Sequence, residues 1–208
     1  MVPLGGYKNK IEKMQDLIEK HSVDIQKLVP LHVDSGRMIR VARAAMTRKP
    51  ELTECTEISL IAAIVEAAVL GLKLETRMNH CWLAGFKNNR TGLRDAQLLM
   101  GYEGYIDLAH RSRMLDSIYA ECVYKNDEFK EHLGTNKRIE HDYDPDKDRG
   151  PIIGVYAVAY LRGSSRPIHE YLPKARIMKL KARGGGGPAW SDPDFGEPGM
   201  FRAKAIKQ

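Results

Sequence analysis

The sequence is poor in the features that mark secreted or metal-binding proteins. It has three cysteines in 208 residues, Cys55, Cys81 and Cys122, which are widely spaced and form no CxxC pair. An odd number of separated cysteines predicts reduced thiols in a cytoplasmic protein rather than a disulfide framework. His80 stands beside Cys81, but no second cluster has zinc-ligand spacing, so we predict no metal site.

Long hydrophobic runs are also absent. The longest, Ile58 to Leu72, is interrupted by Glu66 and is too short to span a bilayer. The N-terminus lacks the basic start, apolar stretch and small-residue cleavage site of a secretory signal. We therefore expect a protein without membrane contacts, located in the cytoplasm.

The sequence has no GxSxG, HExxH or GK[ST] motif, and we predict that the protein is not an enzyme. The alternating aspartates of residues 142–148 resemble a calcium loop, but the glycine and the closing glutamate of that motif are missing. One set of four acidic residues could bind the metal ion of a nuclease, and we keep a metal-dependent nuclease as the alternative function. Its members are Asp107, Glu121, Asp127 and Glu128.

Positive charge is in excess, and it is unevenly distributed. The net charge is +6, with ten Lys/Arg against five Asp/Glu in residues 1–50 and ten against four in residues 151–208. Residues 101–150 reverse the balance, with eight against twelve. Basic ends and an acidic centre indicate a polyanion partner and head-to-tail electrostatic matching between copies, although an uneven solvated surface is the alternative.

Apolar spacing predicts helices before a hairpin and strands after it. The expected helices are 7–28 (as one or two helices), 35–49, 57–70, 102–113, 174–183 and a final basic one from about 198; the expected strands lie in 80–100, 115–125 and 151–173. The 57–70 helix is apolar nearly all round, which predicts that it is buried. Residues 132–150 show no hydrophobic period, which predicts a loop, and the glycines of residues 184–187 predict a flexible joint. The order predicts an α+β fold, with an antiparallel sheet of hairpins packed with helices, a helical N-terminal region and basic C-terminal helices.

Basic residues cluster on two helices and a hairpin tip, with aromatic residues between them. This pattern suits single-stranded nucleic acid, because cations follow the phosphates and rings stack on the bases. For Tyr119 and Tyr124, core packing is an equal alternative. The candidate phosphate contacts are Arg111, Arg113, Arg176, Lys179, Lys181, Arg183, Arg202, Lys204 and Lys207, with Trp190 and Phe201 as apolar or stacking elements.

Four segments in a fixed order carry a family resemblance: "GLKLETRMNHCWLAGFKN", "GYEGYIDLAHRS", "VYKNDEF" and "GPAW…MFRAKAIK". Over about residues 56–208 the chain resembles the RecT family of phage single-strand DNA annealing proteins, which are recombinases. The resemblance implies ATP-independent annealing of single-stranded DNA through an annealed duplex intermediate, by homo-oligomeric rings or filaments in a bacterial host cell. It implies no required cofactor, with magnesium left open, and as further partners a phage exonuclease and a host single-strand binding protein.

The resemblance also assigns residues. Lys87 matches the basic end of the family's first strand, Lys125 opens the "ENDEF"-like segment in place of an acidic residue, and Trp190 matches the tryptophan after the glycines. We add Lys87 and Lys125 to the DNA-binding candidates. Glu103 stands where a basic residue is common. Residues 1–55 are expected to form the helical N-terminal region with oligomer contacts, and residues 56–208 the DNA-annealing core, from which the C-terminal tail is absent.

Overall fold

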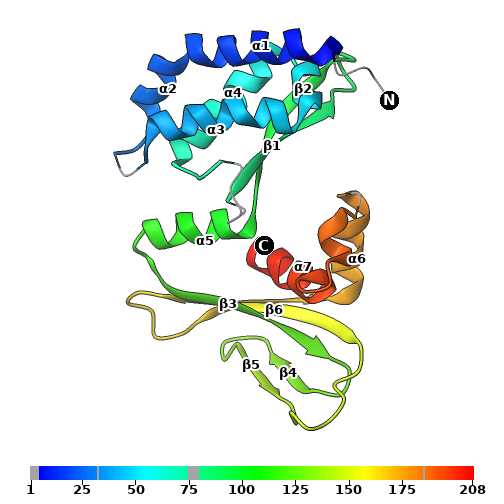
Figure 1. Ribbon diagram of the computed structural model, residues 1–208. Coiled ribbons are helices and arrows are strands. Elements are labelled where there is room, and N and C mark those ends of the chain that lie inside the picture. The colour runs from blue at the N-terminus through cyan, green and yellow to red at the C-terminus, as the bar shows by residue number, and fades with distance from the viewer. Residues whose placement is uncertain (1–4, 32, 75–79, 185) are drawn as a thin grey trace. The chain divides into compact units, whose positions relative to one another are not determined.

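The chain folds as two compact units, Met1–Asp107 and Leu108–Gln208. The structure is a computed structural model that describes residues 5–31, 33–74, 80–184 and 186–208 (Figure 1). The division predicted after residue 55 falls inside the first unit, because the helices that precede it pack against the helix and the hairpin that follow it.

The first unit begins with helices, as predicted. They are α1 (Gly5–Lys20), α2 (Ser22–Leu28), α3 (Ser35–Arg48), the short 3-10 helix η1 (Pro50–Glu54) and α4 (Glu57–Leu70). The predicted cap of α3 is present, since the Asp34 carboxylate accepts a hydrogen bond of 2.8 Å from the Arg37 N–H. Gly71 ends α4 in the left-handed conformation, with φ 61°, which glycine adopts at low cost.

A β-hairpin packs on α4 in this unit. Its strands, β1 (Cys81–Lys87) and β2 (Arg94–Met100), are antiparallel, as the sequence predicts. Two hydrogen bonds fix the start of α4 to β2: the Thr56 hydroxyl donates to Asp95 Oδ1 at 2.9 Å, and the Ala96 N–H donates to Ser59 Oγ at 2.8 Å. These contacts hold one side of α4 against the hairpin.

The prediction that α4 is buried all round is wrong. Leu60 and Ile64 are fully buried, but Ile58 and Val69 are 84% and 54% exposed. The other helices and the hairpin of this unit contact α4 only on part of its circumference. An apolar stripe of α4 therefore remains on the surface.

Helix α5 (Tyr102–Arg111) begins where the sequence predicts. The Gly101 N–H donates a hydrogen bond of 2.9 Å to the carbonyl oxygen of His80. A Cβ atom at Gly104 would overlap that same oxygen, so glycine allows the first turn of the helix to approach the backbone before β1. Close helix packing thus accounts for the second glycine of the Gly-Tyr repeat.

The second unit is built on a three-stranded antiparallel sheet in the order β3-β6-β7. The strands are β3 (Leu115–Tyr124), β6 (Ile152–Leu161) and β7 (Ile168–Pro173). One face is covered by α6 (Lys174–Arg183), the 3-10 helix η2 (Pro188–Ser191) and α7 (Gly196–Ile206), as Figure 1 shows. Val155, Leu172, Ile177 and Phe201 are fully buried between the sheet and these helices. The predicted basic helices are therefore confirmed, and Gly185, in the predicted joint, lies outside the described residues.

A second hairpin contacts the opposite face of the sheet. It consists of β4 (Glu128–His132) and β5 (Arg138–Asp142). The ring centroid of Phe129 lies 5.9 Å from that of Tyr156 and 4.9 Å from that of Tyr171. The prediction of a loop over residues 132–150 is wrong for β5, because a strand with one apolar side chain, Ile139, has too weak an alternation to be recognised.

Together these elements confirm the predicted α+β fold with antiparallel sheets. Of the helices that the structure describes, none has both the length and the apolar character needed to cross a bilayer.

Candidate nucleic-acid interface

Seven of the predicted cationic DNA contacts lie on α6, on α7 or directly after α7, and we call them the basic helical surface. Ile177 of α6 and Phe201 of α7 are fully buried against the sheet, and the lysines and arginines of both helices occupy other positions. Arg176 Nη2 lies 3.3 Å from Gln208 Oε1, which links the start of α6 to the residues after α7. The members are Arg176, Lys179, Lys181 and Arg183 on α6, Arg202 and Lys204 on α7, and Lys207 directly after α7.

Two arginines of this surface form solvent-exposed ion pairs. Arg176 contacts Glu170 at 3.2 Å, and Arg202 contacts Glu121 at 3.1 Å, with about half of each side chain exposed. Exposed pairs of this kind contribute at most about 1 kcal/mol, so a phosphate can replace the carboxylate at little cost. Lys179 and Arg183 are exposed, and no ion pair is found for either within the described part of the chain.

Lys207 is a special position in the basic helical surface. Burial lowers the pKa of its ammonium, and the neighbouring Lys204 lowers it further. Burial and a like charge both disfavour the protonated form. An anion placed between these two lysines would relieve the repulsion, so this end of α7 is a suitable phosphate contact.

Trp190 and Phe201, predicted as apolar or stacking elements, are core residues. Phe201 is fully buried and Trp190 is 9% exposed, and their rings meet edge to face with centroids 6.3 Å apart. Lys181 Nζ lies 4.5 Å from the centre of the Trp190 ring, a cation–π contact. Trp190 therefore lies in the core and contacts Lys181 of α6, which agrees with its prediction as an apolar element.

The other predicted DNA contacts come from separate elements. Lys87 ends β1 in the first unit, opposite Arg94 of β2. In the second unit, Lys125 is exposed directly after β3, and Arg113 is exposed after α5 with φ 60°. Arg111, at the end of α5, is partly buried. In the second unit, the structure thus groups the C-terminal candidates on and directly after two helices that pack on one sheet face, and it places Arg111, Arg113 and Lys125 on other elements.

The "NDEF" segment has a structural role, centred on the Asp127 side chain, which is 0% exposed. Arg149 donates two hydrogen bonds to its carboxylate, at 2.9 Å from Nε and 2.7 Å from Nη2. The Tyr124 N–H donates a third, at 2.8 Å, and His141 Nε2 lies 2.9 Å from Oδ2. These contacts, with the Arg149 hydrogen bonds contributing most, hold the pKa of Asp127 well below its ordinary value.

Arg149 is fixed in turn by two rings. Its guanidinium carbon lies 4.2 Å from the centre of the Tyr124 ring and 4.0 Å from that of Tyr143. The arginine therefore joins the end of β3 to the chain after β5. Neither this arginine nor its role was recognised in the sequence, although a buried aspartate requires a cation or several donors nearby.

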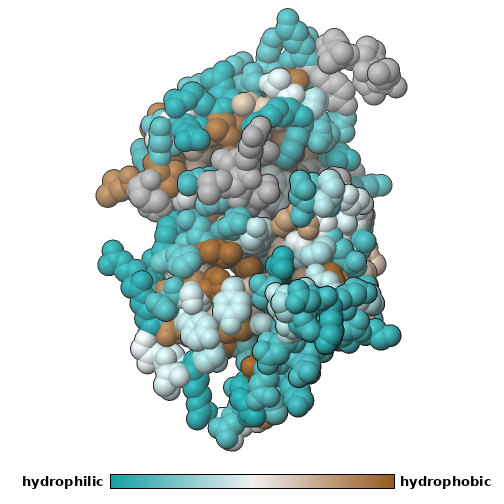
Figure 2. Space-filling model, turned by 60° about the horizontal axis from the view of Figure 1, so that its bottom comes forward, coloured by the Kyte–Doolittle hydropathy of each residue, from teal (hydrophilic) through white to brown (hydrophobic). Residues whose placement is uncertain are grey.

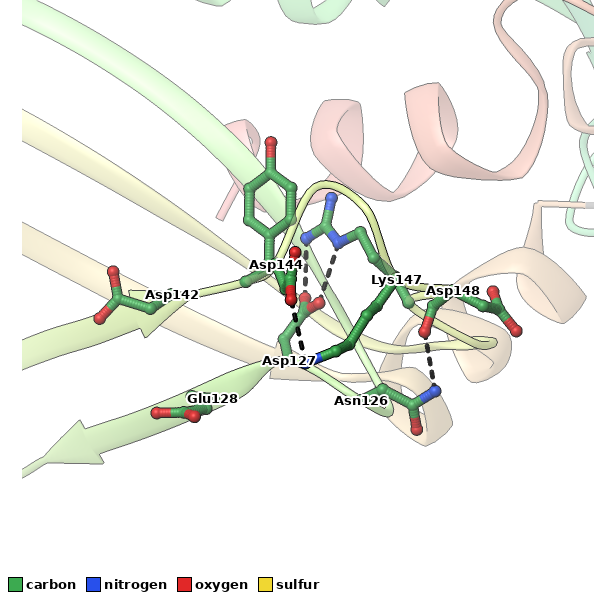
Figure 3. Close-up of a pocket in the computed structure, with 9 residues that line it drawn as sticks. Asn126, Asp127, Glu128, Asp142, Asp144, Lys147 and Asp148 are labelled. Atoms are coloured by element: carbon green, nitrogen blue, oxygen red, sulfur yellow. Dashed lines mark hydrogen bonds and ion pairs between the residues drawn. The ribbon is translucent and has the colours of Figure 1, made fainter.

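The geometry of the second unit does not favour the nuclease alternative. Asp127 is fully engaged by Arg149, Glu121 pairs with Arg202, and Asp107 belongs to the first unit. Figure 3 shows that the Glu128 carboxylate points away from Asp127. Within the described ranges, no three His, Cys, Asp or Glu residues are close enough to hold a metal ion. Within the second unit, Glu121 and Asp127 are thus each engaged by an arginine.

Two tyrosines form an exposed aromatic pair on the β4–β5 side of the sheet. Tyr119 and Tyr160 are 43% and 41% exposed, and their rings stack with centroids 6.5 Å apart. Tyr160 was not singled out in the sequence, but its outward position on β6 follows from strand alternation beside Ala159.

The face of the molecule shown in Figure 2 is mostly hydrophilic, with separate apolar patches.

Comparison with known proteins places the chain in a family. The model of the RecT family matches residues 36–202. The chain is 34% identical to Protein RecT of Escherichia coli (strain K12) over 164 residues, which cover 77% of this chain and 61% of that protein. It is 26% identical to Uncharacterized protein YqaK of Bacillus subtilis (strain 168) over 156 residues, which cover 75% of this chain and 50% of that one. The chain thus spans about half to three fifths of the length of these relatives. On the family match and the identity to RecT together, the chain belongs to the RecT family.

Proposed function

We propose that this protein binds single-stranded DNA on its basic helical surface and anneals complementary strands without ATP, as an oligomer. The observation that carries the proposal is the packing of α6 and α7 on one sheet face, which exposes a set of Lys and Arg side chains. Most of this surface lies within the residues that match the RecT family. Its exposed ion pairs can be exchanged for phosphates.

The binding step depends on phosphates rather than on base sequence. Lys179 and Arg183 form no ion pair with a carboxylate in the described part of the chain, and Arg176 and Arg202 become available when a phosphate displaces Glu170 or Glu121. Contacts of this kind release counterions, so affinity should fall steeply with salt. A strand held by its backbone keeps its bases accessible to a second strand.

The annealing step needs no external energy source. Two free strands repel each other through their phosphates, and cations on the protein reduce that repulsion. Base pairing then supplies the driving force, at about 1.4 kcal/mol per stacked step. We also propose that several subunits bind one strand side by side, so that long stretches pair at once. An exonuclease and a single-strand binding protein remain predicted partners on the family resemblance alone.

The first experiment separates this function from its competitors. A labelled oligodeoxynucleotide is incubated with the protein in magnesium or in EDTA, and competed with unlabelled RNA or DNA of the same sequence. We expect salt-sensitive binding, intact strands on a denaturing gel, and stronger competition by DNA. Strands shortened only in magnesium would support a nuclease, and stronger competition by RNA would support an RNA-binding protein.

A further inference from the structure

The first unit has an apolar groove between α4 and β2, of about 660 Å³. The exposed stripe of α4 forms one wall. Strand β2 and the residues directly before it form the other wall. Among its lining residues, Ile58 is 84% exposed and Leu93 is 56% exposed. We call this feature the α4 groove and define it by Ile58, Ala62, Glu66, Leu93, Asp95 and Gln97.

Acidic side chains give the α4 groove a negative charge. Glu66 is exposed on the α4 stripe. Asp95 accepts hydrogen bonds from the Thr56 hydroxyl at 2.9 Å and from Asn88 Nδ2 at 2.7 Å, and both donors are neutral. Apolar surface next to carboxylates fits a partner that is apolar and basic.

Exposed apolar side chains with lysines nearby also occur in the same unit, at the end of α1, on α2 and in the turn that follows it. Leu31 is fully exposed, and Val23 and Leu28 are 59% and 45% exposed. Lys20 and Lys27 are exposed beside these side chains, while the nearby Asp24 contacts Lys27 at 3.3 Å in an exposed pair. We call Lys20, Val23, Asp24, Lys27, Leu28 and Leu31 the α2 knob, and its two lysines and one aspartate leave one positive charge in excess.

From this complementarity we propose that the α2 knob of one copy docks in the α4 groove of the next copy. The two surfaces are both apolar and opposite in charge, so each matches the other better than it matches itself. Such a head-to-tail contact leaves a knob free at one end and a groove free at the other, and repetition gives a closed ring or an open filament. The inference rests on the proposed function, since it assigns a surface to the oligomer proposed there.

Two variants test the contact with the full chain: Leu31→Glu in the knob and Ile58→Glu in the groove. Both positions are exposed, so the substitutions should preserve the fold, and each places a carboxylate against the acidic groove or inside it. Sedimentation velocity without DNA should show concentration-dependent assembly of the wild type and monomers for each variant alone. An equimolar mixture should form a dimer and nothing larger, because one intact knob meets one intact groove. Leu133→Glu, at an exposed leucine of the second unit, is the matched control and should assemble as the wild type does.

A wild type that stays monomeric, variants that assemble normally, or a mixture that stays monomeric would each overturn the proposed contact. Binding of an oligonucleotide short enough for one subunit distinguishes this failure from a failure of the proposed function. If the wild type binds that oligonucleotide and does not assemble, only the knob-and-groove contact is wrong. If it does not bind, the DNA-binding role itself is wrong.

Discussion

Asp127 illustrates, at the scale of single residues, how a motif can point to chemistry and yet serve structure. Its carboxylate lies among other acidic side chains in Figure 3, and in sequence it invites a metal site. In the fold it accepts both hydrogen bonds of a tyrosine-stacked arginine. The carboxylate is thus a fixed charge that joins β3 to the chain after β5.

The variant Asp127→Asn should lower the free energy of unfolding by roughly 3 kcal/mol at neutral pH, because it leaves the Arg149 charge without its buried partner. Urea unfolding followed by circular dichroism measures the change. Asp142→Asn, at an exposed neighbour, should have little effect. Equal stabilities for Asp127→Asn and the wild type would show that the network contributes nothing.

The same carboxylate predicts a pH dependence. Its pKa in the folded protein lies below the ordinary value of 3.8, so the ionised form stabilises the fold above that pH. The contribution declines as the pH falls below the ordinary value and toward the folded one. The stability gap between wild type and Asp127→Asn should therefore be smaller at about pH 3 than at about pH 7. A gap that widens in acid would contradict this assignment.

Phe201 should behave as a core residue and not as a base-stacking one. Phe201→Ala removes a fully buried ring and should cost about 3–5 kcal/mol of stability. At a low temperature at which the variant is still folded, it should bind single-stranded DNA nearly as tightly as the wild type. A large loss of affinity with unchanged stability would return Phe201 to the binding site.

At the scale of elements, the sequence predicts best where periodicity and caps agree. Asp34 and Gly71 mark helix ends that the structure confirms. Prediction fails where tertiary packing decides: β5 has too few apolar residues to be recognised, and α4 has too many for its exposed stripe to be expected. Whether Trp190 faces DNA or the core is likewise set by which helices cover the sheet, and no local pattern contains that information.

Helix α6 is expected to contribute phosphate contacts to DNA binding. Replacing Lys179 and Arg183 together by glutamine should weaken single-stranded DNA binding and reduce the slope of log affinity against log salt by about 1.4, at about 0.7 per lost phosphate contact. Fluorescence anisotropy over a salt series measures it. Lys130→Gln, on the exposed side of β4, serves as the control. An unaltered slope in the double variant would remove α6 from the interface.

At the scale of the whole molecule, basic residues outnumber acidic ones at both ends of the chain, and we propose a different partner for each end. The C-terminal excess forms the basic helical surface of the second unit, whereas part of the N-terminal excess forms the α2 knob of the first. The charge pattern in the sequence predicts a polyanion partner and matching between copies. It does not show which helix would serve which partner, because that depends on the faces that packing leaves exposed.

The most direct test of the central claim is the annealing rate of two complementary labelled oligonucleotides without ATP. The protein is added to one strand before the other, duplex formation is followed by fluorescence, and strand length is checked on a denaturing gel. Our account predicts that the protein accelerates duplex formation with both strands intact, and that the Lys179 and Arg183 double variant reduces the acceleration. A rate equal to that of the DNA alone, under salt conditions in which the protein binds the first strand, would contradict it.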